Sequence, residues 1–121
     1  MNETEAKALK EKILASMHCA MPGKVVSFDA VSCTAVIQPM VKSRAGRSMP
    51  QLQDVPVYMP MVNGNFAFEV SPGDFCLVIF ADTAIDHWMT TGEEGVPVSD
   101  RKHDLSDGFA FVRFHPHTEG G

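Results

Sequence analysis

A run of six apolar residues, Phe75 to Phe80, constrains the fold of this chain more than any other feature. A Pro-Gly-Asp turn at residues 72–74 precedes the run, and Asp82, Asp86 and Trp88, the single tryptophan, follow it. The run is much shorter than the roughly 20 residues that a membrane-spanning helix needs. Its phenylalanine, valine and isoleucine content and its flanking turn predict a strand that is buried on both faces.

The length and charge of the chain limit the classes of protein to which it can belong. Its 121 residues suit one domain with a modest core. The formal net charge is -5, whereas nucleic-acid-binding proteins usually present a basic face, so the charge argues against that class. The one basic cluster consists of Lys42, Arg44 and Arg47, and we interpret it as a solvated loop between strands.

The three cysteines indicate a reducing compartment, since they are odd in number and contain no C-x-x-C pair. Cys33 and Cys76 lie inside apolar strand patterns and are predicted to be small core residues. Cys19 follows His18, but a catalytic dyad needs a spatial contact that sequence neighbours on a helix rarely make. The first eleven residues are too charged, and lack the apolar segment, for a signal peptide.

The N-terminal segment predicts a helix over residues 3–18. Asn2 can cap it, and Glu5 follows three residues later, as in a capping box. Apolar residues at helical spacing form one stripe along it: Ala6, Leu9, Ile13, Leu14 and Met17. We expect this stripe either to dock on the helix's own domain or to meet copies of itself around an axis.

The rest of the chain has the period-two pattern of strands. The residues at 21–23, Met-Pro-Gly, are predicted to end the helix. Strands are predicted at 24–28, 31–38, 52–58, 66–70, 75–80 and 109–114, with a tight turn at 29–30 and loops at 39–50 and 90–100. Pro56 makes its strand an edge strand or a bulged one. The Asn63-Gly64 pair marks another turn.

This series of strands without alternating helices predicts a mainly all-β fold. We expect a small OB-like barrel of about five to six strands with an N-terminal helix, and a β-sandwich is the alternative. Closure of the barrel would also remove the exposed edges of such apolar strands. The expected organisation is a helix over 1–20, the barrel domain over 21–116 and an exit tail over 117–121.

Five segments in a fixed order resemble one protein family. They are Pro22–Asp29, Thr34–Pro39, Asp54–Val57, Pro72–Trp88 and Asp100–Gly108. Together they resemble the N-terminal OB-fold domain of central-spike proteins from contractile-tailed bacteriophages, which are also called baseplate spike or membrane-piercing proteins. The resemblance covers residues 20–116, and the order and spacing of all five segments make it specific.

The resemblance implies a structural part of a virion and not an enzyme. It implies a homotrimer on the tail axis, assembled in the bacterial cytoplasm, whose OB domain seats the spike on a baseplate hub protein. In the family a C-terminal β-helix with a sharp tip then pierces the host envelope. This chain stops at Gly121 without a repeat that could build a β-helix, so we expect either a piece of a spike or a short member served by a separate tip protein. No cofactor, nucleic acid or direct membrane contact is expected for this domain.

One motif has the composition of a metal site, although we expect no bound metal. His115 and His117 form an H-x-H pair, which in a trimer would bring six imidazoles to one axis. Related spikes use such a pair at the far end of the needle, whereas this pair directly follows the last predicted strand. We therefore interpret it as part of a polar exit tail.

Two clusters of polar residues could in principle perform acid–base chemistry. The first comprises Asp82, Asp86, His87 and Trp88, and the second comprises Arg101, His103, Asp104 and Asp107. Aspartates at strand ends also cap turns, and arginine–carboxylate pairs fix loops. We expect these structural roles for both clusters, with Trp88 anchoring the mouth of the barrel.

Two further functions remain as alternatives to a spike domain. An OB-type single-stranded nucleic-acid-binding module would need a basic groove with exposed aromatics, but the charge is acidic and the phenylalanines are predicted to be buried. A small hydrolase built on the Asp and His residues would lack a recognised nucleophile motif.

Met59 and Met61 flank Pro60, and they are predicted to be either an adaptable contact surface or core filling.

Overall fold

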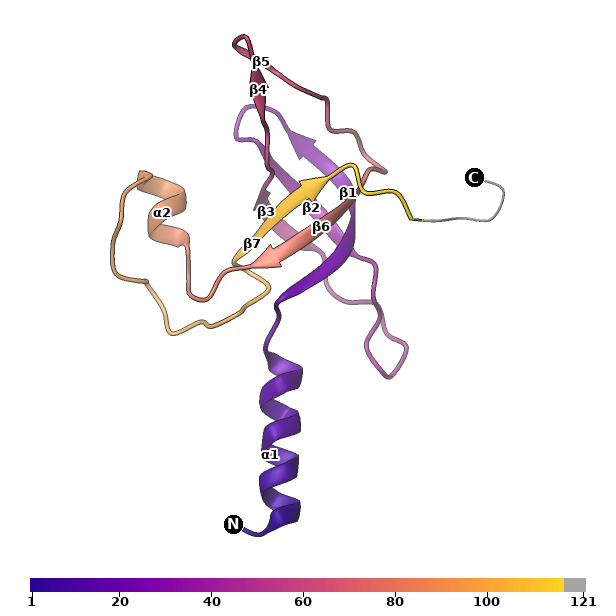
Figure 1. The fold of residues 1–121 in the computed structure, drawn as a ribbon, viewed down its shortest axis with the longest axis vertical. Coiled ribbons are helices and arrows are strands. Elements are labelled where there is room, and N and C mark those ends of the chain that lie inside the picture. The colour runs from indigo at the N-terminus through magenta and orange to yellow at the C-terminus, as the bar shows by residue number, and fades with distance from the viewer. Residues whose placement is uncertain (117–121) are drawn as a thin grey trace.

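The structure is a computed structural model that describes residues 1–116, in which an N-terminal helix is followed by a curled antiparallel sheet (Figure 1). The elements are α1 (Glu3–Ser16), β1 (Ala20–Asp29), β2 (Thr34–Pro39), β3 (Leu52–Pro56), β4 (Met61–Val62), β5 (Asn65–Phe66), β6 (Phe75–Phe80), α2 (Asp86–Thr91) and β7 (Gly108–Val112). The prediction of a mainly β fold with an N-terminal helix is confirmed.

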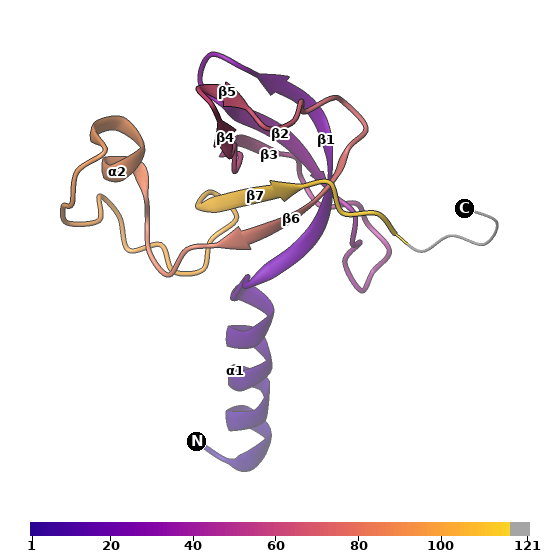
Figure 2. The ribbon, with the colours of Figure 1, turned by 45° about the horizontal axis from the view of Figure 1, so that its top comes forward.

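The five-stranded sheet has the order β3-β2-β1-β6-β7 and curls into a half-barrel (Figure 2). Each pair of neighbouring strands is antiparallel. Just beyond β3, Val57 forms an isolated parallel bridge with Ala110 of β7, so the two outer strands of the sheet approach each other. The second sheet is the small hairpin β4–β5, which lies at the end of the half-barrel opposite to α1.

The core fills the concave side of the half-barrel. It consists of alternate residues of the strands, as the period of two requires. The fully or nearly fully buried members are Val25, Ala35, Ile37, Leu52, Val55, Val57, Cys76, Val78, Phe80, Ala110 and Val112. The prediction that Cys76 is a core residue is confirmed, because it is 2% exposed.

The helix α1 is capped as the sequence predicts, and then ends earlier. The Asn2 Oδ1 atom accepts a 2.8 Å hydrogen bond from the Glu5 N–H group. The helix stops at Ser16, and residues 21–23 lie inside β1, so the prediction that these residues end the helix is wrong. Gly23 serves the strand instead: a Cβ atom there would lie 2.5 Å from Ile37 Cγ2.

The linker between α1 and β1 is bound by backbone hydrogen bonds to the loop that precedes β7 and to β6. His18 N–H donates to the His103 carbonyl at 2.9 Å, and the Cys19 carbonyl accepts from Phe80 N–H at 3.0 Å. The residues of α1 are exposed, and in the described range of 1–116 the helix packs against no strand and not against α2. The expectation that the stripe docks on its own domain is therefore wrong.

The β1–β2 hairpin turns later than the sequence predicts. Residues 30–33 form the turn, rather than 29–30, and the Asp29 carboxylate accepts a hydrogen bond from Val31 N–H. Cys33 has a φ of 56° in this turn and is only partly buried. The prediction that Cys33 is a core residue of the strand is therefore wrong.

Strand β3 is an edge strand with a bulge, which confirms the reading of Pro56. It pairs only with β2, and the register shifts between Ala35 and Ile37, opposite Asp54, whose φ is 49°. The Asn63-Gly64 turn is also confirmed and joins β4 to β5. The strand predicted at 66–70 is wrong, because β5 ends at Phe66.

Candidate assembly surface

The convex side of β1, β6 and β7 carries two adjacent rows of apolar side chains. Cross-strand pairing defines the rows, because Ala20 pairs with Ile79 and Ile79 with Phe109, while Pro22 pairs with Leu77 and Leu77 with Phe111. We call these six residues the outer patch. Ile79 is 42% exposed, and Leu77, Phe109 and Phe111 are partly exposed.

The outer patch corrects the prediction for the apolar run. The run forms β6 with the predicted bounds, Phe75–Phe80, but only Cys76, Val78 and Phe80 are buried. The alternate residues of β6 point to the convex side, which no other layer of the described chain covers. The prediction of burial on both faces is therefore wrong for a single copy.

Two aromatic pairs extend the outer patch at its sides. The ring centroids of Trp88 and Phe109 are 5.6 Å apart, and those of Tyr58 and Phe111 are 5.5 Å apart. Trp88 is 49% exposed and Tyr58 is 59% exposed. Trp88 thus lies beside the outer patch, and the expectation that it anchors the mouth of the barrel is wrong.

Trp88 is positioned by α2, a helix that the sequence reading missed. The signal for it was an acid in the first turn, Asp86, and a glycine after the last turn. Gly92 has a φ of 71°, and its N–H group donates to the Trp88 carbonyl at 2.8 Å. The helix has only six residues, so its position depends on side-chain contacts.

An ion-pair network around the buried Asp107 supplies those contacts and joins the two polar clusters. Arg101 donates to both carboxylate oxygens of Asp107, at 2.9 and 2.8 Å, and to Asp86 Oδ1 at 2.8 Å. Asp107 has 0% exposure, and its Oδ1 also accepts from Ile85 N–H at 3.1 Å. The two carboxylates raise the pKa of Arg101. Asp107 therefore holds both the start of α2 and the arginine that binds Asp86.

The other residues of the clusters form local contacts. His103 Nε2 lies 3.6 Å from Asp82 Oδ1, and His103 Nδ1 is buried without a hydrogen-bond partner in the described part of the chain. Asp104 accepts from Ser106 N–H, which lowers the pKa of its carboxyl group. His87 packs against Gly95, where a Cβ atom would lie 2.3 Å from the imidazole.

The structure does not gather these side chains around one reactive centre. Among residues 1–116, no three His, Cys, Asp or Glu side chains are placed to hold a metal ion. His115 is exposed, whereas His117 and thus the H-x-H pair as a whole lie outside the described residues. Cys19 is exposed at the end of the linker, away from Cys76 in the core.

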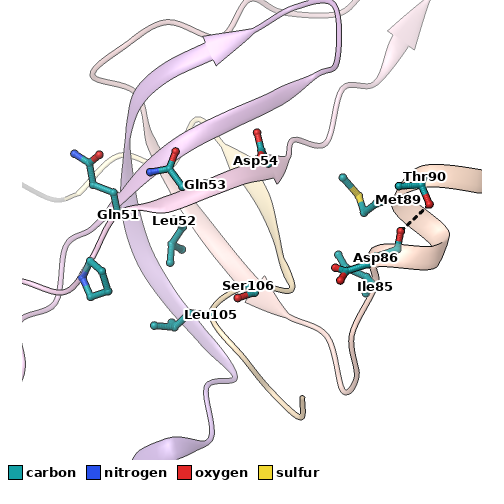
Figure 3. A pocket seen from close by; sticks show the side chains of 11 residues that line it. Gln51, Leu52, Gln53, Asp54, Ile85, Asp86, Met89, Thr90, Leu105 and Ser106 are labelled. Atoms are coloured by element: carbon teal, nitrogen blue, oxygen red, sulfur yellow. Dashed lines mark hydrogen bonds between the residues drawn. The ribbon is translucent and has the colours of Figure 1, made fainter. Parts of the chain in front are cut away.

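A groove of about 540 Å³ separates α2 from the edge strand β3 (Figure 3). Gln51, Leu52, Gln53 and Asp54 form one side, and Ile85, Asp86, Met89 and Thr90 form the other. Pro50, Leu105 and Ser106 complete its lining. Its two carboxylates are Asp54 and Asp86, and the second is already bound by Arg101.

The remaining surface features agree in part with the sequence. The loop with Lys42, Arg44 and Arg47 is exposed, as predicted. Of the two methionines, Met59 packs against the core, which confirms core filling for it, whereas Met61 is 59% exposed on β4, and its use as a contact surface stays a prediction. Within residues 1–116, no helix has the length and apolar character to cross a membrane.

Comparison with known proteins identifies the sheet as the shared part. Residues 21–113 match the model of a protein family described as the phage protein Gp138 N-terminal domain. No curated protein matches the chain. The matched residues begin at the second residue of β1 and end directly after β7, so they contain nearly all of the half-barrel and every residue of the outer patch except Ala20, and they leave α1 outside.

Proposed function

The chain belongs to the Gp138 N-terminal domain family of phage proteins, and from this premise we propose that it is the domain that seats a contractile-tail central spike on its baseplate hub. The family indicates a phage structural protein with a virion-associated location. In the proposed role, three copies form a ring on the tail axis, and a downstream spike or tip protein pierces the cell envelope. The mechanism is association and the transfer of force, without catalysis or a cofactor.

The strand topology supports an OB-type barrel as the body of this ring. The strands β1, β2 and β3 follow one another in the sheet, β6 pairs on the other side of β1, and β7 pairs with β6. The parallel bridge from Val57 to Ala110 then brings β7 beside β3. This strand order is the one expected if the half-barrel is part of a five-stranded, partly open Greek-key barrel, so it supports the proposal.

The observation that carries the proposal is the outer patch. Two rows of apolar side chains, flanked by Tyr58 and Trp88, lie on the convex side of three neighbouring strands. Contiguous apolar patches of this kind on soluble proteins mark interaction surfaces. Around a threefold axis, identical copies can bury the same patch together and close into a ring, which presents a symmetric end to a hub.

Light scattering on purified protein tests the trimer. We expect a particle of three 13.2 kDa chains at micromolar concentration. Ile79→Asp places a charge in the outer patch and should give folded monomers, because the carboxylate would have to be desolvated in the ring. Val31→Asp is the matched control, since Val31 is 97% exposed in the β1–β2 turn and should leave the trimer intact. A monomeric unmodified protein would contradict the proposal.

Labelling of intact particles tests the location. Gold-labelled antibody against the chain should mark the distal end of the contractile tail, on its axis. Label on the capsid, or spread along the tail, would contradict the baseplate assignment, although the chain would still be a virion protein.

The exposed aromatic side chains are the one observation that favours single-stranded nucleic-acid binding. The expectation that the phenylalanines are buried is wrong for Phe66 and Phe114, and Trp88 and Tyr58 are also exposed. Such binders combine stacking aromatics with a basic groove, but the charge of this chain is -5. Binding of a fluorescent oligonucleotide that weakens steeply with salt would favour this alternative.

A further inference from the structure

The helix α1 carries an apolar seam that nothing in the described residues covers. Ala6, Leu9 and Ile13 follow one another at intervals of three and four, which are the a, d and a positions of a heptad. Leu9 and Ile13 are 45% and 48% exposed. The helix extends away from the half-barrel, so the seam faces solvent along its length (Figure 1).

The charges beside this seam specify how it can pair. In the same heptad frame, Glu5 occupies position g and Lys10 occupies position e of the next heptad. In parallel helices a g residue faces the e residue five positions later on the neighbouring helix, so Glu5 of one copy meets Lys10 of the next. Antiparallel helices pair g with g and e with e, and do not bring these two charges together.

The connection of α1 to the sheet favours the same direction. The backbone hydrogen bonds of His18 to His103 and of Cys19 to Phe80 fix where the helix leaves the body. In any ring with a single rotation axis, equivalent helices point the same way along that axis. A parallel arrangement therefore follows from the ring, and the Glu5–Lys10 spacing agrees with it independently.

We propose that the α1 helices of neighbouring copies pack in parallel and in register along the symmetry axis, with Glu5 of each copy paired to Lys10 of the next. This inference rests on the proposed ring. The seam has only three apolar a and d positions, because the next d position is Ser16, and isolated helices of 14 residues are marginal in water, so it does not hold the copies together alone. The sheets set the number of copies, and the helices prolong their contact away from the half-barrel.

Disulfide trapping tests the register. In a Cys19→Ser background, which removes the nearby exposed thiol, Ala6→Cys places thiols of two copies together at one a position only if the helices are parallel and in register. We expect a covalent dimer on a non-reducing gel after mild oxidation. Lys7→Cys, about 100° around the helix from Ala6 and outside the seam, is the matched control and should give no such band, like the background protein. Equal trapping at both positions, or none at Ala6→Cys, overturns the inference.

Charge exchange tests the pair itself. Glu5→Lys or Lys10→Glu alone places like charges together, and each should weaken assembly by about tenfold on dilution, since the loss of a few tenths of a kcal/mol recurs at each interface. The double variant should restore assembly. Single variants that match the unmodified protein, or a double variant as weak as the singles, overturn the pairing. A trimer without trapping refutes the helix inference alone, whereas a monomer refutes the proposed function with it.

Discussion

The two faces of β6 contain the same kinds of residue and differ in what covers them. On the concave face, Cys76, Val78 and Phe80 are at most 4% exposed, within one copy of the chain. On the convex face, Leu77 is only partly covered and Ile79 is 42% exposed. The comparison teaches that the apolar composition of a strand reflects the burial of both its faces, including burial that contact with other copies would provide.

The largest expected effect separates the two faces by a single position. Val78→Asp puts a carboxylate into the core, where the desolvation cost of about 4 kcal/mol or more should unfold the chain. Ile79→Asp makes the same kind of change on the convex face and should leave the circular dichroism spectrum native. Loss of the native spectrum in both variants would mean that the two faces are equally essential to folding.

Next in size is the removal of the buried charge that positions α2 beside the outer patch. Asp107→Asn should lower the free energy of unfolding by about 2–3 kcal/mol, because Arg101 loses its buried partner. The emission of Trp88 should shift to longer wavelength as α2 is released. Asp86→Asn is the control, since this exposed partner of Arg101 should contribute no more than about 0.5 kcal/mol. Equal effects of the two changes would contradict the role given to Asp107.

The concave face also makes a prediction about pH. Burial raises the pKa of Cys76 to about 11 from 9.0. The folded protein therefore binds the thiol proton more tightly than the unfolded chain, so this contribution to stability is complete below pH 9 and is lost as the pH rises toward 11. Urea unfolding should show this fall in the free energy of unfolding, and Cys76→Ala should flatten it relative to the native protein.

At pH 8, a thiol reagent should modify exposed Cys19 and spare Cys76 until the chain unfolds.

The smallest expected effect concerns an aromatic contact at the border of the outer patch. Trp88→Ala removes the tilted ring contact with Phe109 and should lower the free energy of unfolding of one copy by about 1 kcal/mol, because half of the indole is already exposed. Its effect on assembly should be larger, measured as dissociation on dilution. A variant that unfolds easily but assembles normally would show that Trp88 serves the single copy and not the surface.

The sequence predicts well the features that depend on neighbouring residues. The bounds of β6 follow from an uninterrupted apolar run, as the structure confirms. The Asn2 cap and the bulged edge at Pro56 also have local chemical causes. In these cases the sequence pattern and the observed structure both result from interactions between residues that are close in the chain.

The features that the sequence does not predict depend on distant residues. Residues 21–23 stay in a strand because Ile37 and β6 pack against them, which their composition does not reveal. The helix α2 forms where Arg101 and Asp107 hold it, although both residues follow it in the chain. The outer patch needs the pairing of β6 with both β1 and β7 before its two rows exist.

The way in which α1 continues into β1 has a mechanical consequence. β1 is the central strand, bonded to β2 over Gly23–Asp29 and to β6 over Ala20–Lys24. A force applied to the helix acts along this strand. It loads the hydrogen bonds of β1 to β2 and to β6 in shear, so that they share the force and do not break one after another. A tether attached at the N-terminus would thus be anchored in the strongest direction that this sheet offers.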